Sequence, residues 1–393
     1  MDASDLRIAL FSGNYNYIRD GANQALNRLV DYLLKKGAAV RVYSPTVEKP
    51  AFPPNAPVVH IPSVPVPRRA EYKIPVALPP RVRRDIRAFR PNIFHVASPD
   101  ILGHRAVTLA HKLDLPVVAS VHTRFETYFR YYGLAFLEPL VLAGLRRFYR
   151  RCDAIFAPSD SMAQLLREQR MNYDVGIWTR GIDSDIFNPG RRDLAWRRGL
   201  GIADDVPVVG FVGRLVMEKG LDVFSEPIDC LDKRQVRHKV LVVGEGPARD
   251  WFEKRLPQAV FVGFQKGPDL GRAVASMDML FNPSVTETFG NVTLEALAAG
   301  LPVVAAIATG SESLVNDGVN GRLIRPGAID AFTEALRRYC EDPEARAAAG
   351  RAGVEMSRHY GWDEVNQALV DSYCRVIRHR AAGGRPPGPS PVP

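Results

Sequence analysis

Two glutamates, Glu287 and Glu295, stand eight positions apart in the stretch SVTETFGNVTLEALAAGLPVVAA (284–306). A pair of carboxylates first suggests general acid–base chemistry. On a single helix, eight residues would separate the two groups by about 12 Å along the axis. With Glu287 in a loop and Glu295 in the first turns of a helix, both can instead face one ligand. The alternative is two unrelated acids on a capped, solvated helix.

The residues between and after the glutamates describe a helix start. Asn291 can cap a helix over residues 292–299, and Gly300 can end it. The amides of Gly290, Asn291 and Val292 would then point toward an anion, which the helix dipole favours. This arrangement suits a nucleotide sugar. The first glutamate would bind sugar hydroxyls, the helix start a phosphate, and the second glutamate ribose hydroxyls.

A basic loop is expected in the stretch FVGRLVMEKG (211–220), where a strand ends in a glycine. Arg214 and Lys219 follow, five residues apart. Both can converge on a pyrophosphate, the arginine in fork geometry and the lysine as a point charge. A basic loop in solvent is the alternative.

Two stretches in the N-terminal half contain further candidate binding residues. In VVASVHTRFETY (117–128), His122 directly follows a strand, where it can bind a sugar hydroxyl or a phosphate oxygen or be purely structural. In SGNYNYIRDGANQ (12–24), Gly21 lies near a helix start and can allow close approach of a phosphate, or be a simple turn glycine.

Two further motifs match known site patterns only in part. GEGPAR (244–249) has the first two glycines of a dinucleotide fingerprint and lacks the third. DSD (183–185) matches a metal-holding DxD but lies in a turn-rich segment, so no metal is expected there.

Short apolar runs alternate with amphipathic stretches, which predicts parallel, doubly wound α/β sheets. The first helix is expected over 23–37. The expected strands are 7–12, 40–44, 93–97, 116–121, 153–158, 206–213, 238–244, 259–263, 279–283 and 302–306. Residues 50–80 are proline-rich and unsuited to helix or central strand.

The alternation of short apolar runs and amphipathic stretches begins again after residue 203. We therefore expect two similar α/β domains facing each other across a cleft. The predicted boundaries are an N-terminal domain over 1–185, a linker over 186–203, a C-terminal domain over 204–360, a helix over 361–380 and a disordered tail over 381–393.

Composition narrows the class of protein. The 393 residues contain no run of 18 apolar residues, and the N-terminus lacks the features of a secretory signal. The four cysteines form no CxxC, which fits a reducing cytoplasm. Residues 1–185 carry 26 Lys and Arg against 17 Asp and Glu, so the whole net charge of +9 lies in that half. Such a surplus attracts phosphates of lipids, nucleotides or nucleic acid.

Together, these stretches resemble the retaining GT-B glycosyltransferases of family 4, over nearly the whole chain. The resemblance rests on Glu287 and Glu295 as E-x7-E, on VGRLVMEKG, on SVHTRFETY, and on WTRGIDSDIFNP before the second half. WDEVNQALVDSYCRVI (362–377) resembles the family's terminal helix, which crosses back onto the first domain. Within the family, bacterial GDP-mannose-dependent mannosyltransferases and sulfolipid synthases are the most similar.

The resemblance implies a role for each candidate. Arg214 and Lys219 would bind the donor diphosphate, Glu295 the ribose, Glu287 the transferred sugar, and His122 the sugar and phosphate near the reacting carbon. Phe264 and Gln265 would contact the nucleotide base. The donor phosphates would lie along Phe289, Gly290, Asn291 and Val292. Gly21 would also contact the donor, although the family's usual Gly-Gly is DGAN here. Asn23 and Arg124 would bind the acceptor.

The expected activity is therefore transfer of a hexose from a nucleoside diphosphate sugar to a lipid or glycan hydroxyl, with retention and without a metal or other cofactor. GDP-mannose is the first expectation, and UDP-glucose, UDP-galactose or UDP-glucuronate the alternative. A nucleotide-sugar epimerase or hydrolase is a second alternative. A nucleic-acid binder is a remote one, because no RNA-binding signature accompanies the positive charge.

The basic surplus also favours an acceptor at a membrane. Residues 131–152 combine apolar side chains with Arg146, Arg147, Arg150 and Arg151, and can lie on anionic lipid. A half-buried helix with a solvated basic end is the alternative. The expected location is cytoplasmic, peripheral at the inner face of the membrane.

Overall fold

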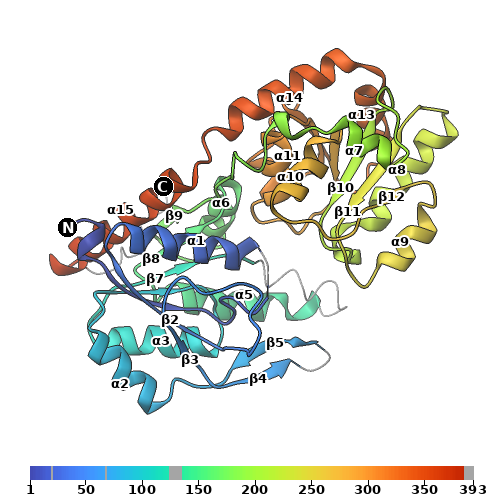
Figure 1. Cartoon of the computed structure of the whole chain (residues 1–393). Helices are drawn as coiled ribbons and strands as arrows, with labels where there is room; N and C mark the ends of the chain where they lie inside the picture. Colours follow the sequence, from blue (N-terminus) through green and yellow to red (C-terminus); the bar gives the residue numbers. More distant parts are fainter. Residues whose placement is uncertain (19–20, 67–68, 124–134, 385–393) are drawn as a thin grey trace. The chain divides into compact units, whose positions relative to one another are not determined.

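The computed structural model describes residues 1–18, 21–66, 69–123 and 135–384 (Figure 1). Clustering of contacts divides the chain into two compact units. Unit 1 comprises Met1–Gly181 and Trp362–Pro393, and unit 2 comprises Ile182–Gly361. Residues 385–393 of the predicted tail and Arg124 lie outside the described residues.

Unit 1 contains a parallel sheet in the order β3-β2-β1-β6-β7-β8-β9. Its strands are β1 (Arg7–Phe11), β2 (Ala39–Ser44), β3 (Val58–His60), β6 (Ile93–Val96), β7 (Val117–Ser120), β8 (Ala154–Ala157) and β9 (Val175–Ile177). The proline-rich segment supplies only the edge strand β3 and an antiparallel pair, β4 (Ser63–Val66) and β5 (Arg69–Pro75). This agrees with its exclusion from helix and central strand.

Helices cover both faces of this sheet. They are α1 (Gly21–Lys35), α2 (Pro80–Phe89), α3 (Ile101–Lys112), α5 (Glu138–Tyr149), α6 (Asp160–Glu168) and α15 (Trp362–Ala381), with the 3-10 turns η1 (Ala3–Asp5) and η2 (Ala135–Leu137). Apolar residues of α2, α3, α5 and α6 form the core on one face. Those of α1 and α15 form the core on the other (Figure 1). The C-terminal helix α15 is therefore part of the core of unit 1.

Unit 2 repeats the plan with a parallel sheet in the order β12-β11-β10-β13-β14-β15. Its strands are β10 (Val208–Val212), β11 (Lys239–Val243), β12 (Val260–Phe261), β13 (Met279–Asn282), β14 (Val303–Ala306) and β15 (Gly321–Ile324). Its helices are α7 (Leu194–Gly199), α8 (Leu221–Lys233), α9 (Arg249–Arg255), α10 (Gly267–Ala275), α11 (Asn291–Ala298), α12 (Thr309–Glu312), α13 (Ile329–Glu341) and α14 (Pro343–Ser357), with η3 (Pro189–Arg191) and η4 (Met217–Lys219).

Both sheets have the strand order of a dinucleotide-binding fold. In this fold, successive strands are added on one side of the first strand, and then the order reverses and later strands are added on its other side. The reversal lies between β1 and β6 in unit 1, and between β10 and β13 in unit 2. Every strand predicted from an apolar run is present, which confirms the α/β class. Ligands of such sheets bind at the carboxyl ends of the strands on either side of the reversal.

Contact clustering assigns the residues of the predicted linker, 186–203, to unit 2. Asp193 caps α7 by accepting a hydrogen bond from the amide of Trp196, at 2.8 Å. Arg197 is fully buried, forms an ion pair with Asp278 at 2.9 Å, and donates to the carbonyl of Val206. The segment lacks helical periodicity because its structure rests on polar side chains.

No helix among the described residues is long and apolar enough to cross a membrane.

Candidate functional site

The candidate site of unit 2 begins with the loop after β10. Gly213, at φ 152°, follows the strand, and Arg214 and Lys219 lie between it and Gly220. Gly220 has φ 74° and begins α8. A Cβ there would lie 3.2 Å from the carbonyl oxygen of Pro283. The glycine therefore lets the loop after β10 pack against the loop after β13.

The loop after β13 leads into α11, and its helix start differs from the prediction in one detail. Gly290, at φ 90°, is the N-cap, and Asn291 is the first helical residue. No side chain caps the helix, so its first amides are left for another acceptor. Asn291 is wrong as the cap because the left-handed glycine turns the chain one residue earlier. Gly300, at φ 81°, ends the helix as predicted.

An ion pair joins the two loops. Lys219 Nζ lies 2.5 Å from Glu287 Oε1, and both side chains are partly buried. The carbonyl of Glu287 accepts hydrogen bonds from Thr309 Oγ1 at 2.8 Å and from the amide of Gly310 at 2.9 Å. The backbone of Glu287 is thus anchored to α12, a support that the sequence did not indicate.

Glu295 lies on α11, half-buried, and no side chain or amide among the described residues donates a hydrogen bond to its carboxyl group. Burial, and then the neighbouring Glu287 carboxylate, raise the pKa of Glu295 to about 8. A carboxyl group that is buried without a partner costs free energy. It is the kind of group that a ligand with hydroxyl donors would satisfy. Arg214, by contrast, is exposed, and its guanidinium has no partner among the described residues.

The remaining donor candidates differ in what they present. The ring of Phe264 is 60% exposed, so it is free to stack on a base. The side-chain amide of Gln265 donates a hydrogen bond to the carbonyl of Val262 at 2.7 Å. Its side-chain oxygen and its backbone are then the groups that can contact a nucleotide base. Phe289 is buried and packs on Tyr360, with ring centroids 5.9 Å apart. The ring of Phe289 is therefore part of the core of unit 2 and is not open to a ligand.

Glycines also pack the loops after β10 and β11 together. A Cβ on Gly244 would lie 1.9 Å from the carbonyl oxygen of Gly213, and one on Gly246 would lie 2.3 Å from that of Leu215. The motif GEGPAR therefore has a structural role that the sequence analysis did not recognise. It lets the backbone that carries Arg214 lie directly on its neighbour.

The candidates of unit 1 lie after β1 and β7. Gly21 is the first residue of α1. Asn23 is buried, and its side-chain amide donates to the carbonyl of Ile18 at 3.0 Å, so part of its hydrogen-bonding capacity braces the loop after β1. His122 follows β7 and is half-buried. Its two ring nitrogens contact Ser120 and Arg180, each at 2.8 Å.

Comparison with known proteins places these features in a family. Residues 19–186 match the model of "Glycosyltransferase Family 4", and residues 206–342 match that of "Glycosyl transferases group 1". The chain is 32% identical to the GDP-mannose-dependent alpha-mannosyltransferase of Mycolicibacterium smegmatis, over 96% of this chain and 99% of that protein. The chain belongs to glycosyltransferase family 4.

Other family members are similar over most of their length. Identity to the sulfoquinovosyl transferase SQD2 of Arabidopsis thaliana is 31%, over 91% of this chain and 71% of that protein. Among solved structures, sucrose-phosphate synthase from Thermosynechococcus elongatus has a TM-score of 0.76 at 18% identity, over 94% of this chain and 99% of that one. Anabaena HepE in complex with UDP has a TM-score of 0.74 at 19% identity, with the same coverage. These neighbours identify the fold of the glycosyltransferase as GT-B.

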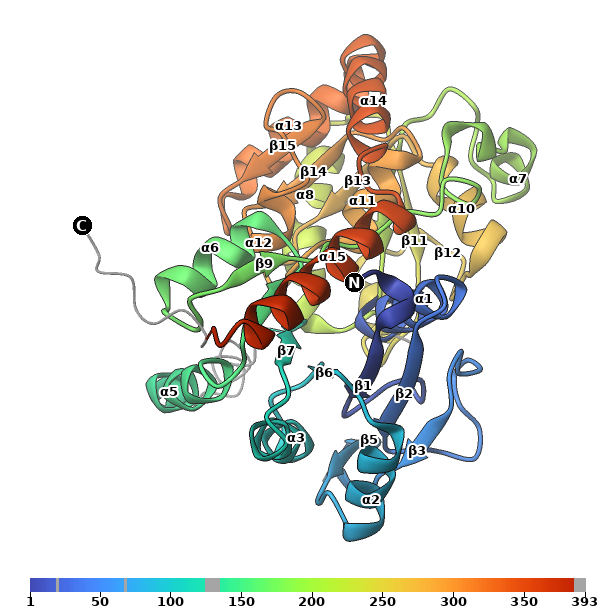
Figure 2. The same cartoon turned by 90° about the vertical axis from the view of Figure 1, so that its left-hand side faces the viewer.

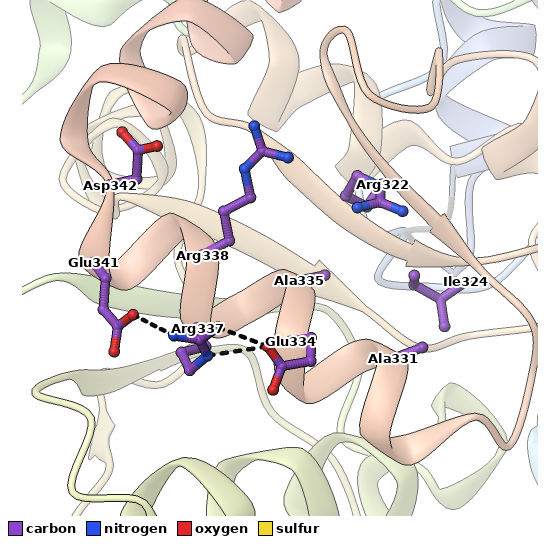
Figure 3. A pocket seen from close by; sticks show the side chains of 9 residues that line it. All are labelled: Arg322, Ile324, Ala331, Glu334, Ala335, Arg337, Arg338, Glu341 and Asp342. Carbon is purple, nitrogen blue, oxygen red and sulfur yellow. Dashed lines mark hydrogen bonds and ion pairs between the residues drawn. The ribbon is translucent and has the colours of Figure 1, made fainter.

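Other features of the glycosyltransferase lie apart from these candidates. A pocket of about 470 Å³ lies between β15 and α13, where Arg337 pairs with Glu334 and Glu341 (Figure 3). None of the predicted site residues lines it. The described residues hold no group of three or more His, Cys, Asp or Glu side chains placed to bind a metal. In the DSD motif, the carbonyl of Asp183 accepts the amides of Ile186 and Phe187, as in a turn.

Proposed function

We propose that this glycosyltransferase moves a hexose, with mannose the first candidate, from a nucleoside diphosphate sugar to a lipid or glycan hydroxyl. The observation that carries the proposal is the Lys219–Glu287 ion pair, which brings the loops after β10 and β13 together where the strand order reverses. A cation, a carboxylate and an uncapped helix start then meet at the place where α/β sheets bind nucleotides.

The roles follow from charge and hydrogen-bonding capacity. Arg214, Lys219 and the first amides of α11 bind the diphosphate. Glu295 accepts hydrogen bonds from the ribose hydroxyls, and Glu287 from hydroxyls of the transferred sugar. Phe264 stacks on the base. Glu287 is a binding group and not a general base, since the lysine occupies one of its oxygens.

The proposed reaction retains the configuration of the sugar. The bond between the anomeric carbon and the diphosphate oxygen breaks, and the acceptor oxygen forms its bond on the same face. The acceptor proton passes to the leaving phosphate. Negative charge grows on the diphosphate as the bond breaks, and Arg214, Lys219 and the α11 dipole stabilise it. These groups supply the positive charge without a metal ion, so we propose that the enzyme is metal-independent.

GDP-mannose is proposed as the donor because the relatives that match over nearly their full length include proteins described as GDP-mannose-dependent. UDP-sugars are the second candidate, favoured by a structural neighbour that was solved with UDP. A thermal-shift series with GDP-mannose, UDP-glucose, UDP-galactose and UDP-glucuronate separates them, because a ligand that binds only the folded state raises its stability. GDP-mannose is expected to give the largest shift, and a larger shift with a UDP-sugar would reassign the donor.

The alternative activity, that of an epimerase or hydrolase, can be tested with the same donor in the absence of an acceptor. Incubation of the enzyme with its donor alone should leave the sugar on the nucleotide. Rapid donor turnover without an acceptor would favour the alternative. Salt-dependent binding of random DNA would favour the remote nucleic-acid alternative, which the proposal excludes.

We also propose that the acceptor is presented at an anionic membrane surface. Phe136 of the 3-10 turn η2 is 75% exposed, and Leu140, four residues later in α5, is 71% exposed. Arg147 is exposed at the other end of α5, and Arg150 follows it. Figure 2 shows α5, α3 and α2 on the same face of unit 1. Exposed apolar residues flanked by arginines are typical of helices that lie on anionic lipid.

A further inference from the structure

A chain of hydrogen bonds runs through the interior of unit 1 and includes the predicted catalytic histidine. Arg180 Nη2 lies 2.8 Å from His122 Nδ1, and His122 Nε2 lies 2.8 Å from Ser120 Oγ. Ser120 Oγ is in turn 2.8 Å from His95 Nε2, and His95 Nδ1 is 2.6 Å from the hydroxyl of Tyr373. Four elements therefore contribute, namely β6, β7, the segment after β9, and α15.

Packing fixes the members of this chain. His95 and Tyr373 are fully buried, Ser120 is 1% exposed and Arg180 is 5% exposed. The ring of Trp178 packs edge-on against His95 and His122, with centroids 6.0 and 5.8 Å away. The guanidinium of Arg180 lies 5.0 Å from the same ring. Arg180 also donates to the carbonyls of Trp178 and Thr179, at 3.0 and 3.1 Å.

The donors and acceptors leave one protonation state for His122. A guanidinium only donates hydrogen bonds, so Nδ1 of His122 must accept and carries no proton. A neutral imidazole has one N–H group, so the proton lies on Nε2 and is donated to Ser120. A second proton on Nδ1 would face the arginine and break that hydrogen bond.

The state of His95 does not alter this result. In one arrangement Ser120 donates to His95, and His95 donates to Tyr373. In the other, Tyr373 donates to His95, and both histidines donate to Ser120. A third arrangement, in which Ser120 donates to His122, would leave the ring of His122 without a proton. Both allowed arrangements place the proton of His122 on Nε2.

We propose that Arg180 is a positioning residue that holds His122 as the neutral Nε2–H tautomer, so that His122 serves the reaction as a neutral hydrogen-bonding group and not as an acid or a base. The functional part of this proposal rests on the proposed function and on the family resemblance, which implies that His122 lies against the transferred sugar. The tautomer itself follows from unit 1 alone.

Among the described residues, the groups that shift the pKa of His122 act in the same direction. Burial, then the charge of Arg180 and then His95, lower the pKa of His122 well below its ordinary value. Burial lowers the pKa of His95 to about 3. Burial raises the pKa of Tyr373 above its ordinary range, so its hydroxyl stays protonated. No ionisation of His122 is therefore expected between pH 6 and 9.

The direct test is nitrogen NMR of the full chain labelled with ¹⁵N-histidine. Two-bond ¹H–¹⁵N correlations distinguish the two neutral tautomers and the cation, and the signals missing from the His122→Gln variant assign the residue. The expected result is the Nε2–H pattern, unchanged from pH 6 to 9. An Nδ1–H or cationic pattern at pH 7 would overturn the proposal, whatever the enzyme's donor or acceptor proves to be.

Variants of Arg180 test whether this residue holds the tautomer of His122. In Arg180→Ala, the freed Nδ1 is expected to accept a proton, so that the midpoint of His122 titration rises toward 6.5. Arg180→Lys keeps a cationic donor and should keep the wild-type NMR pattern. This variant tests the role of residue 180 if Arg180→Ala does not fold. Arg375→Ala, an exposed arginine of the same unit paired with Asp174, is the matched control. An unchanged tautomer and titration in Arg180→Ala would contradict the role assigned to Arg180.

Discussion

Glu295 is proposed to bind the ribose, so its protonation should affect donor binding. Its pKa of about 8 means that the carboxyl group of the free protein is largely protonated at neutral pH. Ribose hydroxyls donate better to a carboxylate than to a carboxylic acid, because hydrogen bonds to a charged acceptor are stronger. Donor binding should therefore release a proton from this site. The same raised pKa implies that the folded protein loses stability as the pH rises from about 4.5 to 8, because in that window the folded state binds more protons than the unfolded state.

The pH dependence of donor binding tests this assignment. Below pH 8, affinity for the donor is expected to rise with pH by up to about tenfold per unit, as proton release requires. Calorimetry in two buffers of different ionisation enthalpy would measure the proton released. In Glu295→Gln, which cannot ionise, both the slope and the release should disappear. A wild-type affinity that is flat between pH 6 and 8 would show that Glu295 does not bind the donor as a carboxylate.

At the scale of elements, the loop after β13 packs closely against Gly310 of α12. A Cβ on Gly310 would lie 2.7 Å from the carbonyl carbon of Phe289 and 2.9 Å from Glu287 Cβ. Such contacts are closer than real Cβ atoms allow, so a side chain there must push the loop and its glutamate away. The loop, and not the helix alone, therefore sets the position of the Glu287 carboxylate.

The Gly310→Ala variant should separate loop position from overall folding. We expect a loss of about 1–3 kcal/mol of stability from overpacking, and a loss of donor affinity of at least about tenfold, as for a misplaced binding group. Denaturant unfolding and donor titration measure the two effects. Gly199→Ala is the matched control, since a Cβ there meets nothing within 4 Å. Wild-type donor affinity in Gly310→Ala would show that the loop position is not needed for binding.

Elements and site residues differed in how far the sequence could predict them. Short apolar runs predicted the central strands because both faces of a parallel sheet are buried. The strand β15, with the sequence GRLI at the sheet edge, has no such run and was missed. The helix start after Glu287 was placed one residue late, because Gly290 and Asn291 are both suitable caps. Arg180 and Gly310 were missed because their roles depend on residues 58 and 23 positions away.

At the scale of the whole molecule, part of the positive charge of residues 1–185 lies on the helices that cover one face of the sheet of unit 1. Arg81, Arg83, Arg84 and Arg87 of α2 are exposed, as is Arg105 of α3. These helices share a core with α5, and the exposed Phe136 and Leu140 lie in η2 and in the first turn of α5. The opposite face of the sheet is covered by α1 and α15 instead. An anionic surface would therefore meet unit 1 on the side of α2, α3 and α5.

Liposome flotation should detect this preference. We expect binding to vesicles that contain anionic lipid, little binding to neutral vesicles, and loss of binding at high salt because the charges are exposed. Replacing Phe136 and Leu140 by serine should weaken binding several-fold, since each removes exposed apolar area from the contact. Leu34→Ser, on α1, is the control. Equal and negligible binding to both kinds of vesicle would remove the membrane proposal.

In the proposed function, unit 2 binds the diphosphate of a nucleotide sugar through Arg214 and its neighbours. Calorimetric titration of GDP-mannose into wild type, Arg214→Ala and Arg358→Ala tests it most directly. Arg358 is a matched arginine of unit 2 that is 69% exposed and paired with Glu355. We predict saturable binding to wild type and Arg358→Ala, and at least about tenfold weaker binding to Arg214→Ala, as the loss of a charge-assisted contact implies. Equal affinity in all three proteins would contradict the account.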